Sequence, residues 1–243
     1  MLSAPSKGFI KDQGDQGDCV FQRPIMFVGA DVTHPAPDQM GLKPSIAAVV
    51  ASYDPAVSLY NVEVNVQYSK QDNKNVVEQI MNLETMMKSL LIKFKEKTEG
   101  REPERIVFYR DGVSEGQFQM VVNKEIAAIQ RACKKLNGNF QPGITYFVAQ
   151  KRHRTRLYPS DDKNKLRNGN ILPGTIIDTD ITHPTVSSFY LASHEGEYAF
   201  LKGFLCKFIF LSHIMKAFRA QPNQRTMSSC TMIAICRLMW NRR

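Results

Sequence analysis

The chain has 243 residues, of which 43% are hydrophobic and 23% charged, enough to bury one sizeable core in one or two domains. It has neither an apolar run of about eighteen residues nor an apolar N-terminal stretch, which argues against a membrane span and a secretory signal. The formal charge of +9 is unevenly placed, because residues 1–196 hold 24 basic against 22 acidic side chains and residues 197–243 hold 8 against 1. Whole-chain charge is therefore weak support for nucleic-acid binding.

The hydrophobic pattern predicts a mixed α/β domain. Residues 1–21 are polar and are expected to be a flexible lead-in. Short apolar or alternating runs predict five strands, at about residues 25–30, 44–53, 58–68, 106–109 and 145–148. Helical spacing predicts helices over about residues 75–97 and 114–136, the second with Ser114 as N-cap and Gln117 at the capping-box position.

Two of the predicted strands end on an aspartate, Asp31 and Asp111. Residues at the carboxyl ends of strands face the crevice where open α/β sheets hold ligands. Two carboxylates side by side repel each other unless a cation lies between them, and hard oxygen ligands favour Mg²⁺ or Mn²⁺. Two-metal cleavage of phosphodiesters uses this arrangement. The alternative is that both aspartates cap the turn or helix that follows.

Cysteine usage and local charge indicate a compartment and a partner. Five cysteines without a Cys-x-x-Cys pair leave one unpaired in any disulfide scheme, which favours a reducing, cytoplasmic location. A basic cluster follows the fifth predicted strand, and only Asp161 and Asp162 oppose it; its members are Lys151, Arg152, Arg154, Arg156, Lys163, Lys165 and Arg167. Such a cluster is either a solvated face or a loop that tracks phosphates.

Six short strings then point to one family. They are Gly-Ala-Asp-Val-Thr-His-Pro at 29–35, Tyr-Arg-Asp-Gly-Val-Ser-Glu-Gly-Gln at 109–117, residues 141–156, Gly-Asn-Ile-Leu-Pro-Gly at 169–174, Asp-Thr-Asp-Ile-Thr-His-Pro-Thr at 178–185 and Ser-His-Glu-Gly at 193–196. In this order and spacing they closely resemble the Piwi domain of eukaryotic Argonaute proteins, over roughly residues 22–196.

The resemblance implies a ribonuclease H-like fold, a mixed five-stranded sheet with flanking helices. In that fold the first and fourth strands are neighbours, which places Asp31 beside Asp111. The expected organisation is a lead-in over residues 1–21, a Piwi domain over 22–196 that is incomplete at its C-terminus, and a tail over 197–243 that does not match the family.

The resemblance also implies a set of site residues. Slicing Argonautes use an Asp-Glu-Asp-His set, and alignment of the first long helix places its glutamate at Glu78, so that Asp31, Glu78 and Asp111 would hold two Mg²⁺ ions. The residues that match or adjoin guide-contacting positions are Lys151, Arg152 and His194 by match, and Arg154 and Arg156 by proximity. For His34 and His183, each in a Thr-His-Pro string, a structural role is favoured over metal ligation.

The tail departs from the family, and His213 does not stand in the context of the fourth ligand. Read in a shifted frame, permitted codons for residues 229–242 spell Val-Tyr-Asp-Asp-Ser-Asn and more of the family's next strand and helix. We therefore expect residues near 197–220 to be translated intron and the remainder to be an exon read out of frame. Sequencing the transcript tests this.

Three functions remain open from the sequence. The first is guide-directed binding and Mg²⁺-dependent cleavage of RNA in gene silencing, with cleavage expected to be very weak without the fourth ligand. The second is a module that holds guide RNA, target RNA or silencing-complex proteins without cutting. The third is a product that does not fold. No membrane partner is expected.

Overall fold

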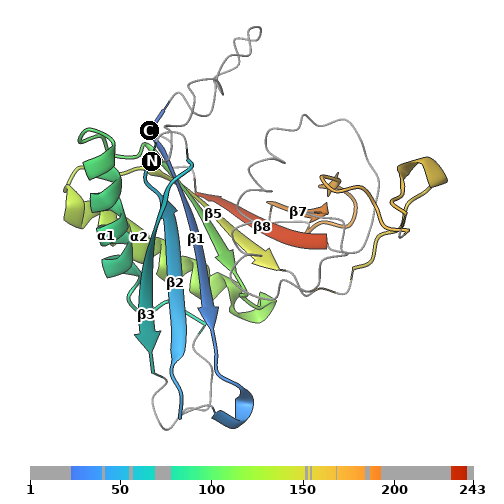
Figure 1. The fold of residues 1–243 in the computed structure, drawn as a ribbon, viewed down its shortest axis with the longest axis horizontal. Coiled ribbons are helices and arrows are strands. Elements are labelled where there is room, and N and C mark those ends of the chain that lie inside the picture. Colours follow the sequence, from blue (N-terminus) through green and yellow to red (C-terminus); the bar gives the residue numbers. More distant parts are fainter. Residues whose placement is uncertain are drawn as a thin grey trace, which may run out of the picture.

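The computed structural model describes residues 23–39, 42–54, 57–68, 78–150, 153, 155–167, 169–183, 187–192 and 231–239. Ten strands and α-helices follow in chain order: β1 (Ile25–Thr33), β2 (Ser45–Ser52), β3 (Tyr60–Gln67), α1 (Leu83–Lys97), β4 (Arg105–Asp111), α2 (Phe118–Leu136), β5 (Gly143–Gln150), β6 (Ile176–Ile177), β7 (Ser187–Ala192) and β8 (Thr231–Met239). Single-turn 3₁₀ helices lie at Pro37–Gln39, Glu115–Gln117 and Asp162–Asn164. Figure 1 shows one sheet with both α-helices beside its first strands.

The strand order confirms the predicted ribonuclease H-like sheet. Strands β1, β2 and β3 form an antiparallel meander, β4 lies parallel to β1, and β5 lies parallel to β4. The sheet then continues through β8, β7 and β6, for a full order of β3-β2-β1-β4-β5-β8-β7-β6. Strand β8 comes from the tail for which no matching element was predicted, yet it pairs antiparallel with β5 and β7.

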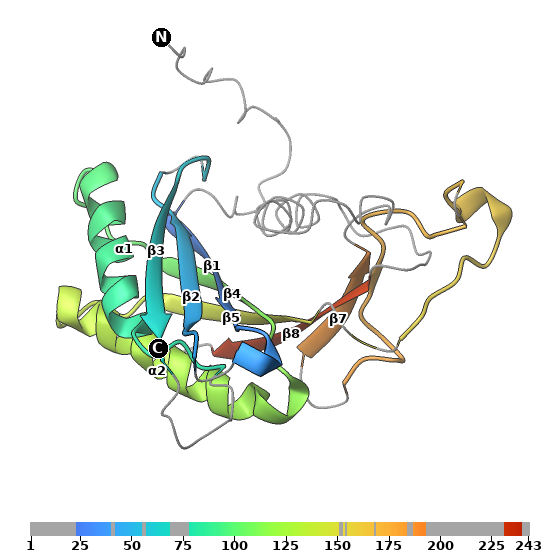
Figure 2. The same cartoon turned by 60° about the horizontal axis from the view of Figure 1, so that its bottom comes forward.

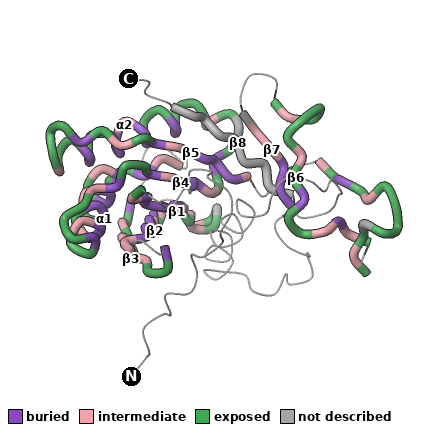
Figure 3. Tube along the Cα trace, turned by 90° about the horizontal axis from the view of Figure 1, so that it is seen from above, coloured by how far each residue is buried: buried purple, intermediate pink, exposed green. Residues whose placement is uncertain are grey.

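Each central strand is buried on both faces, and alternate residues enter different cores. On β1, Met26 and Val28 belong to a large cluster shared with both helices, whereas Ile25 and Phe27 belong to a smaller cluster on the opposite face. This division follows from the two-residue period of a strand. Figure 2 shows α1 and α2 together on one side of β1–β5, and Figure 3 shows the buried residues concentrated along these strands.

Aromatic pairs hold the two central parallel strands in register. Phe108 stacks on Tyr146 with ring centroids 5.0 Å apart, and Tyr109 stacks on Phe147 at 5.1 Å. In both pairs one partner stands directly opposite the other on β4 and β5. Because neighbouring residues of a strand point to opposite faces, one stack lies on the helix side of the sheet and the other on the far side.

The helices end as predicted but begin later. Helix α1 starts at Leu83, so the prediction of a helix from residue 75 is wrong for residues 78–82, which form a bend and a turn. Ser114 is not the N-cap of α2, because a 3₁₀ turn intervenes and the Ser114 hydroxyl contacts the Gln117 side chain at 3.3 Å. No helix in the described part of the chain has the length and apolar composition needed to cross a membrane.

Cys133 on the inner face of α2 is 1% exposed, and its burial raises the pKa of its thiol to about 12. Since the thiolate is the reactive species, we expect iodoacetamide at pH 8 to leave Cys133 unmodified in the folded protein. Peptide mapping by mass spectrometry measures this, with the same thiol in concentrated urea as control. Equal labelling of folded and unfolded protein would contradict the packing of α2.

Candidate functional site

Two aspartates lie side by side where β1 and β4 end. Ala30 pairs with Arg110 across the parallel strands, so Asp31 and Asp111 are the next residues of each strand. Both strands run further than the predicted ranges of 25–30 and 106–109: β1 continues two residues beyond Asp31, and Asp111 is the last residue of β4. Both are half-buried. The two residues therefore stand on neighbouring parallel strands, as the resemblance implied.

Gly112 allows the chain to turn away immediately after this pair. Its φ is +88°, a conformation that strains residues with a Cβ atom. A Cβ atom at this position would also lie 3.5 Å from Oδ1 of Asp31, which shows how closely the turn passes the opposite carboxylate. Gly112 donates its amide to the Ala149 carbonyl of β5 at 3.4 Å, which ties the turn to the next strand.

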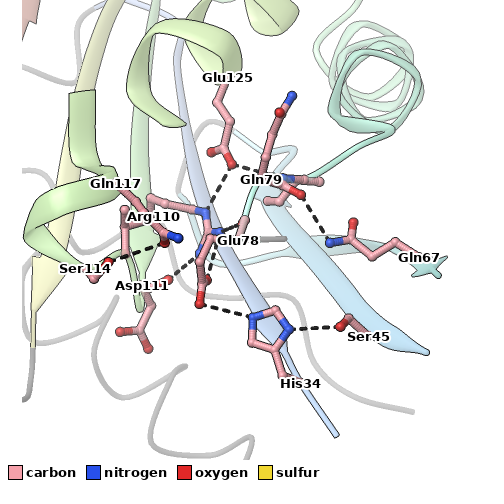
Figure 4. A network of polar contacts seen from close by, with 12 residues as sticks. His34, Ser45, Gln67, Glu78, Gln79, Arg110, Asp111, Ser114, Gln117 and Glu125 are labelled. Carbon is pink, nitrogen blue, oxygen red and sulfur yellow. Dashed lines mark hydrogen bonds and ion pairs between the residues drawn. The ribbon is translucent and has the colours of Figure 1, made fainter. Parts of the chain in front are cut away.

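Glu78, the third predicted ligand, approaches the same edge of the sheet from the segment before α1. Its Oε1 lies 3.2 Å from Nε2 of His34, as a close contact and not an aligned hydrogen bond. Nδ1 of His34 bonds the Ser45 hydroxyl at 2.9 Å. His34 therefore links Glu78 to the start of β2, a structural role of the kind favoured from the sequence. Figure 4 shows this chain of contacts.

Arg110 joins the glutamate segment to the end of β4. Its guanidinium donates from Nη2 to the Glu78 carbonyl and from Nη1 to the Asp111 carbonyl, and Nη2 lies 3.9 Å from the Glu78 carboxylate. The side chain is fully buried. One arginine thus binds the backbone of both a predicted ligand on β4 and the predicted ligand before α1.

A buried acid and a tyrosine complete this network. Nε of Arg110 donates to Oε1 of Glu125 on α2 at 3.3 Å, and the Tyr146 hydroxyl on β5 donates to Oε2 of Glu125 at 2.5 Å. Arg110, Glu125 and Tyr146 are all 0% exposed. None was singled out from the sequence, although Glu125 stands between Val122 and Ile126 on the apolar stripe of α2, where a charge requires a partner.

The three predicted ligands come from two faces of the sheet. Tyr109 belongs to the cluster away from the helices, and Asp111 shares its face by alternation, whereas Arg110 and the Glu78 contacts lie on the helix side. Among the described residues, no three His, Cys, Asp or Glu side chains gather closely enough to hold a metal ion. The aspartate pair fits a divalent cation by its donor chemistry, but Glu78 is not gathered with it here.

The predicted RNA-contacting residues are only partly described. Lys151, Arg152, Arg154 and His194 lie outside the described residues. Arg156 is exposed, and its Nη1 donates to the His153 and Thr155 carbonyls at 2.8 and 2.9 Å. The stretch around His153 and Thr155 packs on β7, because the Thr155 hydroxyl donates to the Tyr190 hydroxyl at 3.2 Å and the His153 ring packs edge-on against Tyr190.

Exposed cationic side chains follow His153 along residues 156–167. Burial, reinforced by the charge of Arg156, lowers the pKa of His153. Lys163, Lys165 and Arg167 are exposed further along, although Lys165 is paired with Asp162 at 2.5 Å. The second Thr-His-Pro histidine, His183, donates its amide to the Ser188 hydroxyl at 2.9 Å, which joins its loop to β7.

The model of the Piwi domain family matches residues 10–203, most of the chain. The chain belongs to the Piwi domain family. Solved structures agree on the fold. Kluyveromyces polysporus Argonaute with a guide RNA matches with a TM-score of 0.66 at 24% identity, over 91% of this chain and 22% of that one. The C-terminal lobe of a budding yeast Argonaute matches with a TM-score of 0.64 at 25% identity, over 88% of this chain and 38% of that one. Drosophila Piwi matches with a TM-score of 0.56 at 21% identity, over 91% of this chain and 24% of that one.

The matches show how much of the related proteins this chain represents and which of its elements the family shares. The chain spans between about a fifth and two fifths of the length of the solved proteins that it resembles. The family match covers β1 to β7 and therefore the aspartate pair, Glu78 and the basic segment. The carboxylates of this Piwi domain thus stand in the part of the chain that the family shares.

Proposed function

We propose that this Piwi domain binds a guide–target RNA duplex and that its carboxylate site cleaves the target strand in a Mg²⁺-dependent reaction. The observation that carries the proposal is the placement of Asp31 beside Asp111 at the carboxyl ends of two parallel strands. Family membership supports the RNA partner, since one solved Argonaute of the same fold holds a guide RNA. RNA silencing in the cytoplasm is the proposed setting.

The chain's own groups have distinct tasks in this proposal. Asp31 and Asp111 supply oxygen ligands, and Glu78 is the third carboxylate at the same edge of the sheet. Asp31 and Asp111 would hold a divalent ion, which would supply acidification of a bound water and stabilisation of the leaving oxygen's charge. The exposed basic segment holds phosphates and thereby sets the register of the duplex, since A-form RNA is recognised through its backbone and 2′-hydroxyls.

A second candidate is a Piwi module that binds RNA without cutting it. One observation favours it: Glu78 is held by His34 and Arg110, and no three metal-binding side chains of the described part gather into one group. The two candidates share the RNA-binding step and differ only in cleavage. Guided cleavage in Mg²⁺, measured beside duplex binding on the same preparation, therefore separates them.

Replacement of Arg156 by alanine is expected to weaken binding of a fluorescein-labelled RNA duplex and to lower the slope of log affinity against log salt by about 1, because one phosphate contact is lost. Fluorescence anisotropy over a salt series measures both. Arg101→Ala is the matched control, since Arg101 is also exposed but lies just after α1, far along the chain from the basic segment. An equal loss in both variants would mean that only net charge matters.

A further inference from the structure

Beneath the carboxylate edge, the structure contains a fully buried polar relay that the proposed reaction does not use directly. It runs from the Tyr146 hydroxyl on β5, through the Glu125 carboxylate on α2, to the Arg110 guanidinium on β4. We infer that Glu125 and Tyr146 are positioning residues, which orient Arg110 so that it holds the Glu78 segment against the end of β4. This inference rests on the proposed function of the carboxylate site and extends it.

The contacts of Glu125 carry the first step. Its Oε1 accepts from Nε of Arg110 at 3.3 Å and also from the backbone amide of Ile80 at 3.1 Å, two residues after Glu78. The same carboxylate oxygen therefore binds two groups: the backbone of residues 78–82, which contain Glu78, and the arginine that also binds this backbone. Ile80 is 1% exposed, so its amide has no access to water as an alternative partner.

The role of Tyr146 follows from its burial and its ring stack. Burial, with the neighbouring charge of Glu125, raises the pKa of Tyr146 well above its ordinary value, so the hydroxyl keeps its proton and donates it in a hydrogen bond. The stack on Phe108 fixes the ring. The hydroxyl thus satisfies Oε2 of Glu125 and leaves Oε1 to face Arg110 and Ile80.

A purely structural explanation accounts poorly for this relay. Apolar side chains of similar volume often replace a buried ion pair with no loss of stability. Apolar side chains, however, could not bind the Glu78 carbonyl, the Asp111 carbonyl and the Ile80 amide at once. The second support of the segment is independent: Gln67 donates to the Gln79 carbonyl at 3.1 Å and accepts from the Met81 amide at 3.3 Å. The segment is held from both sides, and the relay sets its distance from β4.

The test uses the full chain with Tyr146→Phe and Glu125→Gln, both of which keep side-chain volume. Glu84→Gln is the control, because Glu84 pairs with Arg131 and Lys135 between α1 and α2 but has no contact with the relay. The hydrogen-exchange rate of the Ile80 amide, measured by NMR and compared with that of Met86 inside α1, reports how firmly the segment around Glu78 is held. Paramagnetic broadening by MnCl₂ of the Gly112 and Gln79 amides reports whether the segment stays beside the aspartate pair.

In both relay variants we expect exchange of Ile80 to rise about fivefold or more while Met86 is unchanged, and Mn²⁺ to broaden Gly112 as before but Gln79 less than in the unmodified chain. Glu84→Gln should change neither. The inference is overturned if Ile80 does not respond, if Ile80 and Met86 rise together, or if Gln79 is broadened as in the unmodified chain. If Mn²⁺ leaves Gly112 of the unmodified chain unbroadened, the proposed cation site fails, while the exchange of Ile80 still decides the positioning role.

Discussion

Replacing Asp111 by asparagine lowers Mg²⁺-dependent cleavage of a guided RNA target by at least about a thousandfold, if the carboxylate pair is the catalytic centre. The stabilisation that a bound ion supplies is several kcal/mol, and about 4 kcal/mol corresponds to a thousandfold change in rate. Asparagine keeps the shape of the side chain but removes the charge beside Asp31. Single-turnover cleavage of a labelled target measures the loss, with duplex binding expected to be unchanged.

The control for this experiment is Asp178→Asn, which removes the same charge from an exposed loop position. We expect it to cleave as the unmodified chain does. If the unmodified chain binds the duplex but shows no Mg²⁺-dependent cleavage, the non-cutting module is the better description. If Asp178→Asn and Asp111→Asn are equally impaired, the carboxylate pair is not the site.

Replacing Arg110 by methionine is expected to destabilise the fold by about 3–5 kcal/mol, because Glu125 then remains buried without its guanidinium partner. The Tyr146 hydroxyl and the Ile80 amide still bond to the two oxygens of that carboxylate, but both are neutral donors and leave its charge without a counter-charge. Urea unfolding followed by circular dichroism measures the change. Adding Glu125→Gln to the variant should recover part of the loss, since the unpaired charge is then removed.

Arg131→Met on the same helix pair provides the comparison. Arg131 binds Glu84 at 2.6 Å, but its side chain is 56% exposed, and exposed ion pairs contribute about 0–1 kcal/mol. Similar losses for Arg110→Met and Arg131→Met would show that burial of the Arg110–Glu125 pair does not govern stability. A loss confined to Arg110→Met supports the relay as the polar centre of the domain.

The first five strands could be predicted because each has a clear pattern in the sequence. Continuous apolar runs marked β1, β4 and β5, and the resemblance supplied their order, which placed Asp31 beside Asp111. The end of α2 at Leu136 was also predicted. Local periodicity shows the strands and the end of α2 in a single sequence, whereas the pairing of β1 with β4 was implied by the resemblance.

Features that depend on tertiary contacts were missed. The apolar spacing through Ile80 predicted a longer α1, but the Ile80 amide donates to the Glu125 carboxylate. The Gln67 side chain donates to the Gln79 carbonyl and accepts from the Met81 amide. Side chains from α2 and β3 therefore replace the backbone bonds that a helix would have made. Strands β6, β7 and β8 were also not predicted: β6 has only two residues, and β8 lies in a tail without family strings.

The alternation along β4 has a consequence for how this site can change. Arg110 points into the core and its neighbour Asp111 lies beside Asp31, while aromatic stacks on both faces hold β4 against β5. Insertion or deletion of one residue in β4 would exchange the two faces. It would place a carboxylate opposite Glu125 and a guanidinium beside Asp31, reversing the charge at both places. Point substitutions can therefore adjust this site gradually, but a change in the length of β4 would abolish core and site together.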